Sequence, residues 1–286
     1  MIGAGLVALA SCGDDGGGDS GEVSVVASFY PLAFVAEEVG GDDVTVTDLT
    51  PSGAEPHDLE LTTDQVDEIL DADLAVVMGD GFQPAVEETA DDRNGETVEV
   101  LPAVVGDEDD PVDPHVWLAP ALMEETVAAV TAGLAEADPA NAAAYAARGR
   151  ALARRVRALD AEYESGLGDC ERDTIVTAHD AFGRLADRYG LEVEPIAGLS
   201  PDEEPSPERL AELADLAEDE GVTTIFTETL VSPDVADTLA REAGGLETAV
   251  LNPLEGLTDE ELDAGDDYFT VMQDNLAALE AALGCR

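Results

Sequence analysis

The chain contains only three histidines in 286 residues, and each lies where an imidazole could bind a metal ion. His57 lies in the turn "PSGAEPHDLELT", His115 lies in "VDPHVWLAP" and His179 lies in "IVTAHDAFG". Each segment leaves the end of an expected strand or enters an expected helix, which is the edge where open α/β sheets bind ligands. Three neutral imidazoles form a nitrogen site that suits Zn²⁺, at about 2.0–2.1 Å for each Zn–N bond.

The spacing of the histidines does not by itself predict a shared site. No pair shows a local zinc motif such as His-Glu-x-x-His, and long stretches of chain separate all three. For each histidine taken singly, a hydrogen bond at a loop is the plainer interpretation. A common site therefore requires a fold that brings the three loops together.

The elements that would position these loops alternate between strand-like and helical segments, which is typical of a parallel sheet covered by helices. In the first half we expect strands at 23–29, 44–50, 74–79 and 97–102, with helices in "PLAFVAEEVGG", near 62–72 and in "PAVEETADD". In the second half we expect strands at 173–178, 191–197, 223–228 and 247–252, with helices at 180–189 and near 206–220, 233–244 and 267–283.

Between the two halves the chain is helical for a long way. One segment runs from Ala119 to Pro139, and an alanine-rich segment, which favours an uninterrupted helix, continues to about Gly168. We therefore predict an α/β fold of two lobes joined by one long helix. The expected parts are a signal end and flexible tether (1–22), an N-terminal lobe (23–138), the linking helix (139–168) and a C-terminal lobe (169–286).

The charge of the chain is strongly negative. There are 66 acidic residues against 12 basic ones, all of them arginine, which gives a formal net charge of −54. Binding to nucleic acid or to an anionic membrane surface requires cationic patches, so this balance argues against both. We interpret the excess, including the run "GDEDDPVD" at 106–113, as a solvated acidic surface.

The N-terminal segment "MIGAGLVALASC" is too short to span a bilayer but resembles the end of a secretory signal. Its last four residues resemble a bacterial lipobox, which implies that Cys12 is the lipidated first residue of the mature protein. The glycine- and aspartate-rich residues 13–22 have the composition of a flexible tether. The alternative is an ordinary buried segment with an incidental cysteine.

The remaining cysteines are Cys170 and Cys285. In an exported protein two cysteines most simply form a disulfide, which would fasten the last helix to the start of the second half. Two free buried thiols are the alternative, and the spacing alone does not exclude them.

Five motifs in order carry a resemblance to a known family: "SGAEPHDLELT", "DPHVWLAP", "TAHDAFGRLADRYGL", "TTIFTETLVSPDVADTLARE" and "LNPLEGLT". The chain resembles, over about residues 22–286, the substrate-binding lipoproteins of bacterial zinc and manganese ABC importers. This resemblance implies two parallel-sheet α/β lobes joined by one rigid helix, with the metal held between the lobes. By motif, His57 and His115 are the ligands from the first lobe and His179 is the ligand from the second.

The resemblance also bears on the metal and its remaining ligands. Manganese-associated relatives often carry a carboxylate at the position of His179, so the histidine here favours Zn²⁺ over Mn²⁺. Many relatives use an aspartate in the motif written here as "LNPLEG", where this chain has Asn252. The fourth ligand is therefore open among Asn252, Glu55 and water. Glu228 is a candidate for a hydrogen bond to a ligand histidine, or for a helix cap or a contact at the edge of the core.

The function that the resemblance implies is capture of Zn²⁺ outside the cytoplasmic membrane for an ABC permease and its ATPase. We expect a monomer that reaches the membrane only through its lipid anchor and is not an enzyme. A zinc hydrolase is the alternative from another class, because three histidines and a water also describe a catalytic site. An adhesin or a receptor for another solute on the same scaffold is the third.

Overall fold

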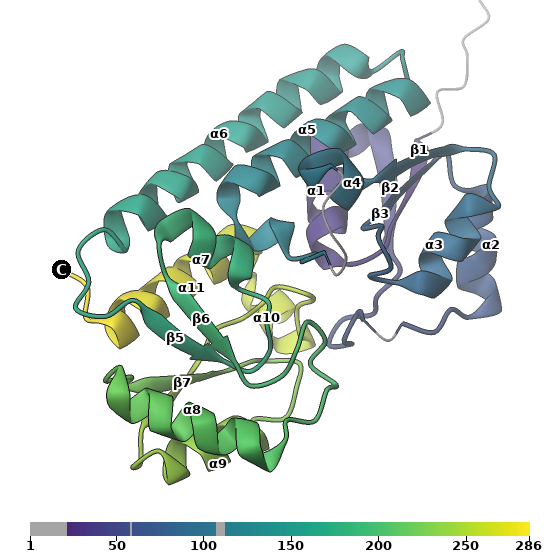
Figure 1. The fold of residues 1–286 in the computed structure, drawn as a ribbon. Helices are drawn as coiled ribbons and strands as arrows, with labels where there is room; N and C mark the ends of the chain where they lie inside the picture. The colour runs from purple at the N-terminus through teal and green to yellow at the C-terminus, as the bar shows by residue number, and fades with distance from the viewer. Residues whose placement is uncertain (1–21, 58, 107–111) are drawn as a thin grey trace, which may run out of the picture.

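The computed structural model describes residues 22–57, 59–106 and 112–286, and it shows two α/β lobes beneath a pair of long helices (Figure 1). Each lobe contains a four-stranded sheet in which all neighbouring strands are parallel, with the orders β2-β1-β3-β4 and β6-β5-β7-β8. The predicted fold class is thus confirmed. The strands are β1 (Val23–Ala27), β2 (Val44–Asp48), β3 (Leu74–Val77), β4 (Glu96–Glu99), β5 (Thr174–Thr177), β6 (Glu192–Pro195), β7 (Thr224–Thr227) and β8 (Glu247–Val250).

The sequence of each strand reflects its place in its sheet. The central strand β3 reads "LAVV" and is buried along its whole length, as are β5 ("TIVT") and β7 ("TIFT"). Strands that are covered by helices on both faces need apolar or hydrogen-bonded side chains throughout, and this accounts for their unbroken runs. The edge strands β2 and β8 are partly exposed.

Helices flank both sheets. In the first lobe these are α1 (Tyr30–Gly40), η1 (Gly41–Asp43), α2 (Thr63–Asp71), α3 (Pro84–Asp91), α4 (Val100–Val105) and η2 (Val116–Leu118). In the second lobe they are α7 (Gly183–Tyr189), α8 (Pro207–Asp219), α9 (Asp234–Glu242), α10 (Asp259–Ala264) and α11 (Tyr268–Leu283).

The segment expected as a strand at 97–102 differs from the prediction. Strand β4 ends at Glu99 and the chain turns directly into α4. Pro102 has no N–H for a sheet ladder but is tolerated in the first turn of a helix, and the N–H of Leu101 donates to the carbonyl of Met78 at 2.8 Å. Val100 and Leu101 are therefore buried in the first turn of a helix rather than in a strand.

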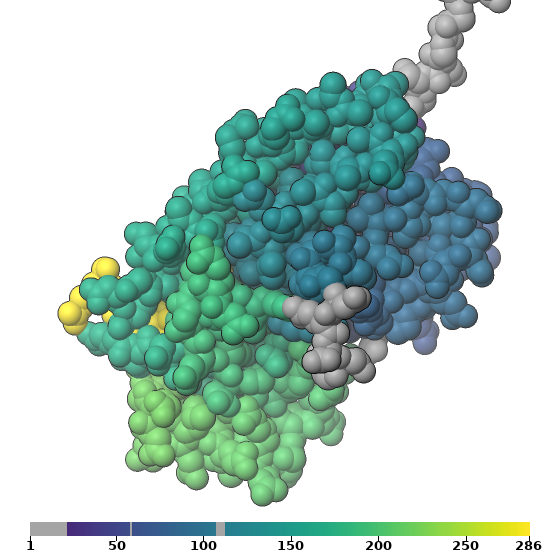
Figure 2. Space-filling view, turned by 45° about the horizontal axis from the view of Figure 1, so that its top comes forward, coloured from purple at the N-terminus to yellow at the C-terminus, as the bar shows by residue number. Residues whose placement is uncertain are grey.

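Two long helices, α5 (Pro120–Ala137) and α6 (Ala142–Gly166), pack against each other, and α6 runs along both lobes (Figures 1 and 2). Helix α6 is hydrogen-bonded to each lobe. Near its start, Nε of Arg148 donates to the carbonyl of Val39 in α1 at 2.6 Å. Near its end, the hydroxyl of Tyr163 donates to the carbonyl of Met272 in α11 at 2.6 Å. Because both ends are fixed, α6 joins the lobes as a continuous rod.

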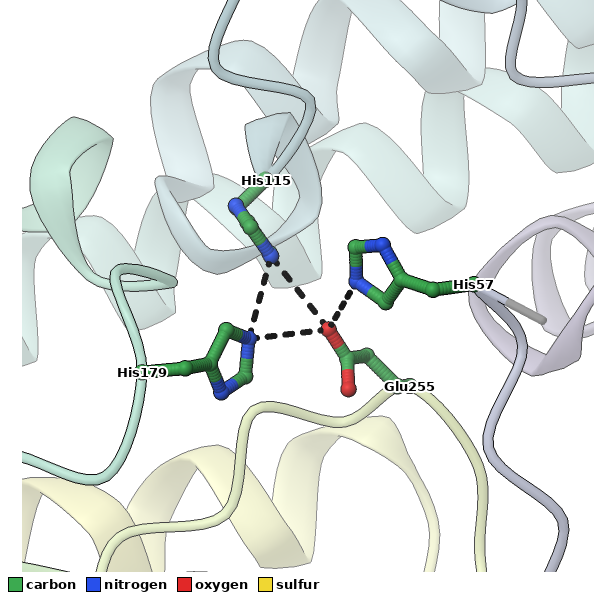
Figure 3. A group of neighbouring side chains, drawn as sticks. All are labelled: His57, His115, His179 and Glu255. Atoms are coloured by element: carbon green, nitrogen blue, oxygen red, sulfur yellow. Dashed lines mark hydrogen bonds and ion pairs between the residues drawn. The ribbon is translucent and has the colours of Figure 1, made fainter. Parts of the chain in front are cut away.

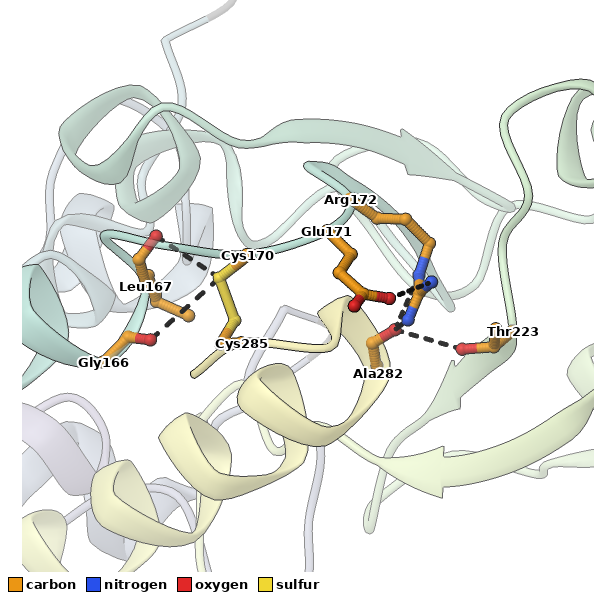
Figure 4. The surroundings of a disulfide bond; sticks show 8 residues. All are labelled: Gly166, Leu167, Cys170, Glu171, Arg172, Thr223, Ala282 and Cys285. Carbon is orange, nitrogen blue, oxygen red and sulfur yellow. Dashed lines mark hydrogen bonds and ion pairs between the residues drawn. A yellow bond between two sulfur atoms is a disulfide. The ribbon is translucent and has the colours of Figure 1, made fainter.

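A disulfide between Cys170 and Cys285 fastens the end of α11 to the segment that follows α6 (Figure 4). The predicted pairing is present, and the alternative of two free thiols is not. Beside it, Nε of Arg172 and the hydroxyl of Thr223 donate to the carbonyl of Ala282 at 3.2 and 3.0 Å. The last turn of α11 is thus held by both a covalent bond and hydrogen bonds.

One cluster of buried apolar side chains continues through both lobes, from Val25 and Val76 in the first sheet to Phe226 in the second. The lobes therefore share a core. Across residues 22–57, 59–106 and 112–286, no helix combines the length and apolar character that crossing a bilayer requires. Cys12 and the expected tether lie outside the described residues.

Candidate metal centre

The three histidines come together between the lobes, each carried by a loop (Figure 3). His57 lies in the turn between β2 and α2, and His115 directly precedes η2. His179 lies in the loop after β5. The structure adds a fourth side chain that was not among the expected residues, Glu255 in the loop after β8.

The spacing of the four side chains matches that around one small ion. Oε1 of Glu255 lies 3.0 Å from Nε2 of His57, 3.3 Å from Nε2 of His115 and 3.2 Å from Nε2 of His179. The two Nε2 atoms of His115 and His179 are 3.4 Å apart, and all four donor atoms lie within 4.8 Å of one another. Tetrahedral bonds of about 2.0–2.1 Å place neighbouring donors about 3.3–3.4 Å apart. These donors therefore suit tetrahedral Zn²⁺.

The cluster is buried. The side chains of His115 and His179 are 0% exposed, that of Glu255 is 1% exposed and that of His57 is 11% exposed. Only His57 reaches toward solvent. A charge at this depth is costly unless it is paired, so a divalent cation and Glu255 would compensate each other here.

Carboxylates fix which nitrogen of each buried imidazole faces the centre. Nδ1 of His115 is 2.8 Å from Oδ1 of Asp113, and Nδ1 of His179 is 2.7 Å from Oε1 of Glu228. A carboxylate accepts a hydrogen bond there, so Nδ1 keeps its proton and Nε2 is the nitrogen that can release its own proton and offer a lone pair. Both imidazoles are thus held in the tautomer that binds a metal through Nε2.

An acid-Pro-His sequence occurs twice and folds in the same way. In "EPH" the N–H of His57 donates to Oε2 of Glu55 at 3.0 Å, and in "DPH" the N–H of His115 donates to Oδ1 of Asp113 at 3.0 Å. In each case the carboxylate two residues before the histidine fixes its backbone. Asp113 is 23% exposed, so the interpretation of 106–113 as solvated charge is wrong for this residue.

The His57 turn has a further support from the residue that directly precedes α3. The buried side chain of Gln83 donates through Nε2 to the carbonyls of Pro56, at 3.1 Å, and Ser28, at 3.3 Å. It therefore ties the residue before His57 to the end of β1.

The pKa values of these groups reflect mutual charge compensation. Burial alone would lower the pKa of His179, but hydrogen bonds to Glu228 and Glu255 outweigh burial and raise it to about 10. At His115, too, burial lowers the pKa, but hydrogen bonds to Asp113 and Glu255 outweigh burial and raise it. The pKa of Glu255 is held well below its usual range, because hydrogen bonds from the three histidines outweigh its burial.

The other expected residues lie around the cluster. Burial, followed by the nearby Glu255 charge, raises the pKa of Glu55 to about 8, and its Oε1 is 4.0 Å from Nε2 of His57. The amide oxygen of Asn252 accepts the N–H of Leu254 at 2.8 Å, so it is engaged within its own loop. Of the roles open to Glu228, the structure shows the hydrogen bond to a histidine, His179.

Residues 25–282 match the family described as the zinc-uptake complex component A, periplasmic. The chain belongs to this family. It is 36% identical to the high-affinity zinc uptake system protein ZnuA of Bacillus subtilis, over 99% of this chain and 96% of that protein. It is 35% identical to the zinc-binding lipoprotein AdcA of Streptococcus pneumoniae, where 95% of this chain matches 58% of that protein. The chain thus spans somewhat more than half the length of the streptococcal relative.

Solved structures of similar proteins share the fold. The Zn(II)-bound ZnuA-like domain of AdcA from Streptococcus pneumoniae is 35% identical and has a TM-score of 0.80, covering 92% of this chain and 99% of that one. A laminin-binding protein of Streptococcus agalactiae, described as having adhesin and metal-transporting activity, is 32% identical with a TM-score of 0.84. That match covers 91% of this chain and 99% of that one.

Proposed function

We propose that the protein is the extracytoplasmic zinc receptor of an ABC importer, in which His57, His115, His179 and Glu255 bind one Zn²⁺ as cargo. The observation that carries this proposal is the placement of three Nε2 atoms around Oε1 of Glu255 at 3.0, 3.3 and 3.2 Å. The family and the names of its relatives support zinc uptake as the context.

Zinc is favoured over manganese by the donor set. Three imidazoles and one carboxylate oxygen form a compact site of mixed nitrogen and oxygen donors, which suits Zn²⁺. Manganese prefers more oxygen donors and a larger coordination number. Asp113 and Glu228 complete the site by holding their imidazoles in the metal-binding tautomer.

Cargo binding accounts for the burial of the site better than hydrolysis does. A hydrolase needs an open coordination position next to a substrate pocket, whereas His115, His179 and Glu255 are at most 1% exposed. A transported ion needs only to be enclosed and then released to the permease. An ABC permease and its ATPase are the partners that this role requires.

The attachment of the receptor to the membrane is part of the same proposal. The "LASC" segment and the glycine-rich residues 13–22 support lipidation of Cys12 followed by a flexible tether. One relative is named a zinc-binding lipoprotein. The protein would act as a monomer on this anchor.

The experiment that tests the proposal is metal analysis of purified Cys12→Ala protein, followed by competitive titration with Zn²⁺ and Mn²⁺. We expect one equivalent of Zn²⁺ that Mn²⁺ does not displace at equal concentration. Zinc should also raise the melting temperature by mass action, and far less so in His57→Ala, His115→Ala or His179→Ala. Equal zinc-induced shifts in all four proteins would place the site elsewhere.

A further inference from the structure

The loop "LNPLEGLT" must place one carboxylate oxygen at a single point. Its residues Leu251, Asn252, Leu254 and Glu255 are at most 3% exposed, so the loop runs through the interior rather than over the surface. One oxygen of Glu255 points at the three imidazoles and the other points away (Figure 3). The direction of this side chain is set by the backbone immediately before it.

That backbone has an unusual conformation. Leu254 has a φ of +56°, and among the described residues only one other non-glycine residue, Asp80, has a positive φ. A non-glycine residue is disfavoured in the left-handed region because its Cβ lies too close to the following carbonyl oxygen, so the surroundings must hold Leu254 there. Leu254 directly precedes Glu255, so this conformation determines where the carboxylate points.

The side chain of Asn252 stabilises the conformation of Leu254 from within the loop. Its Oδ1 accepts the N–H of Leu254 at 2.8 Å, and its Nδ2 donates to Oε1 of Glu261 at 2.9 Å. An asparagine side chain that bonds the backbone two residues later is a common way to fix a turn. Both polar atoms of the side chain are therefore used to shape the loop.

Asn275 of α11 holds Asn252 in turn. Its Oδ1 accepts the N–H of Asn252 at 2.8 Å, and its Nδ2 donates to the carbonyl of Asn252 at 2.7 Å. Asn275 is 2% exposed and Asn252 is 3% exposed. Burying an amide group is costly unless it is hydrogen-bonded. The hydrogen bonds between Asn252 and Asn275 therefore favour one relative arrangement of the two residues. The buried pair thus fixes the loop to the helix behind it.

We propose that Asn252, locked by Asn275, is a positioning residue for zinc binding. It holds Leu254 in the left-handed conformation and so directs Glu255 at the histidines, without binding the metal itself. This inference rests on the proposed function, because it requires Glu255 to be a zinc ligand. It also gives the asparagine of "LNPLEG" a role different from that of a fourth ligand.

The test compares zinc affinity, metal geometry and stability in four variants. Asn252→Ala removes the side-chain hydrogen bonds to Leu254 and Glu261, and Glu255→Ala removes the carboxylate. The double variant Asn252→Asp/Glu261→Gln exchanges donor and acceptor, so that every hydrogen bond of the loop is kept. Tyr163→Phe is the matched control, since it removes a buried hydrogen bond to α11 away from this loop.

The readouts are the zinc dissociation constant from chelator competition, the visible spectrum of the Co²⁺-loaded protein, and the melting temperature without metal. We expect Asn252→Ala to weaken zinc binding by roughly tenfold to a hundredfold, as for other residues that orient ligands. Its Co²⁺ spectrum should approach that of Glu255→Ala. The double variant should resemble wild type in zinc affinity and in its Co²⁺ spectrum. Tyr163→Phe should change only the melting temperature.

The outcomes separate the two proposals. If Asn252→Ala keeps the wild-type affinity and Co²⁺ spectrum while Glu255→Ala loses both, Asn252 is not a positioning residue and the zinc site stands. If Glu255→Ala also binds zinc as wild type does, the proposed site itself is wrong. Should Asn252→Ala fail to fold, Asn252→Leu tests the same point, because leucine fills a similar space but has no acceptor for the Leu254 N–H. Wild-type affinity and spectrum in that variant would equally overturn the inference.

Discussion

The indole N–H of Trp117 donates to the carbonyl of Pro253 at 2.7 Å, across 136 residues of sequence. This bond ties the turn that carries His115, in the first lobe, to the loop that carries Glu255, in the second. The ring of Trp117 is fully buried and its centroid is 5.1 Å from that of His115. Two sides of the candidate metal centre are thus joined by one side chain.

Zinc binding should change the fluorescence of Trp117, the only tryptophan in the chain. An ion bound to His115 alters the charge beside the indole, so one equivalent of Zn²⁺ should change the emission and a chelator should reverse the change. Titration of the metal-free protein with Zn²⁺ measures this. The emission should not change in His115→Ala at the same zinc concentration. An unchanged wild-type spectrum would contradict binding at this centre.

The variant Trp117→Phe tests the bond between the lobes. It leaves the buried carbonyl of Pro253 without its donor, so the free energy of unfolding should fall by about 1–3 kcal/mol. Chemical denaturation followed by circular dichroism measures this loss.

The order of the eight strands could be predicted from the sequence because short strand-like runs alternate with recognisable helices, although the strand expected at 97–102 ends at Glu99. The three histidines were candidates because histidine is rare here, with three in the whole chain, and the resemblance to the importer receptors grouped them as ligands. Glu255 could not be predicted as part of the site, because it is one of 66 acidic residues and lies in a loop without periodicity. Its role depends on a left-handed Leu254 and on contacts with distant elements.

Asp113 is an intermediate case. It stands two residues before His115, as Glu55 stands before His57, and the repeated acid-Pro-His pattern could have indicated a carboxylate that fixes each histidine. The surrounding acidic run concealed this signal. Helix α4 was missed for a different reason, because its short apolar segment suits a strand or a helix equally.

Zinc affinity should rise with pH and binding should release protons. A nitrogen that binds zinc cannot hold a proton, and the pKa of His179 is raised to about 10 by Glu228 and Glu255 against the effect of burial. At neutral pH zinc must therefore displace at least this proton. Calorimetric titration in two buffers with different ionisation enthalpies measures the release. Affinity that is independent of pH across the neutral range would contradict the prediction.

The same pKa predicts the opposite trend for the protein without metal. Because the pKa of His179 is raised from 6.5 to about 10, its contribution to stability is fully present below 6.5 and is lost as the pH rises through 10. The melting temperature of His179→Ala should lack this part of the pH dependence.

Removal of the disulfide should destabilise the protein without weakening zinc binding. The bond closes a segment with a sequence separation of 115, for which the chain-entropy model gives an upper figure of about 4–5 kcal/mol. Denaturant unfolding of Cys170→Ser/Cys285→Ser should show a loss of up to this size. The double variant should keep its zinc affinity, because neither cysteine contacts the cluster among the described residues. A large loss of affinity would mean that α11 must be clamped for Asn275 to act.

Lipidation of Cys12 predicts that the wild-type protein is found with the membrane fraction and that Cys12→Ala is released. A single acyl chain anchors only marginally, so the diacylglycerol-type modification of lipoproteins would be needed. Mass spectrometry of the mature N-terminus and cell fractionation measure this. Cys285→Ser is the control for loss of a cysteine as such. Equal membrane association of Cys12→Ala and wild type would exclude the anchor.

The charges of Asp113 and Glu228 should strengthen zinc binding although neither residue is proposed to touch the ion. In Glu228→Gln the amide oxygen still accepts the Nδ1–H of His179, so the tautomer is kept and only the charge is lost. Zinc affinity should fall by roughly tenfold to a hundredfold, and Asp113→Asn should behave in the same way at His115.

The pH dependence of this loss distinguishes charge from simple distortion. Without the Glu228 charge the pKa of His179 falls, since the hydrogen bond to Glu228 is the largest influence that raises it against burial. Protons then compete less with zinc, so the deficit of Glu228→Gln should be greatest in alkali and should shrink toward acid. Glu68→Gln on the exposed side of α2 makes the same change in net charge and should leave the affinity unchanged. A deficit that is the same at every pH would mean that Glu228 acts through geometry alone.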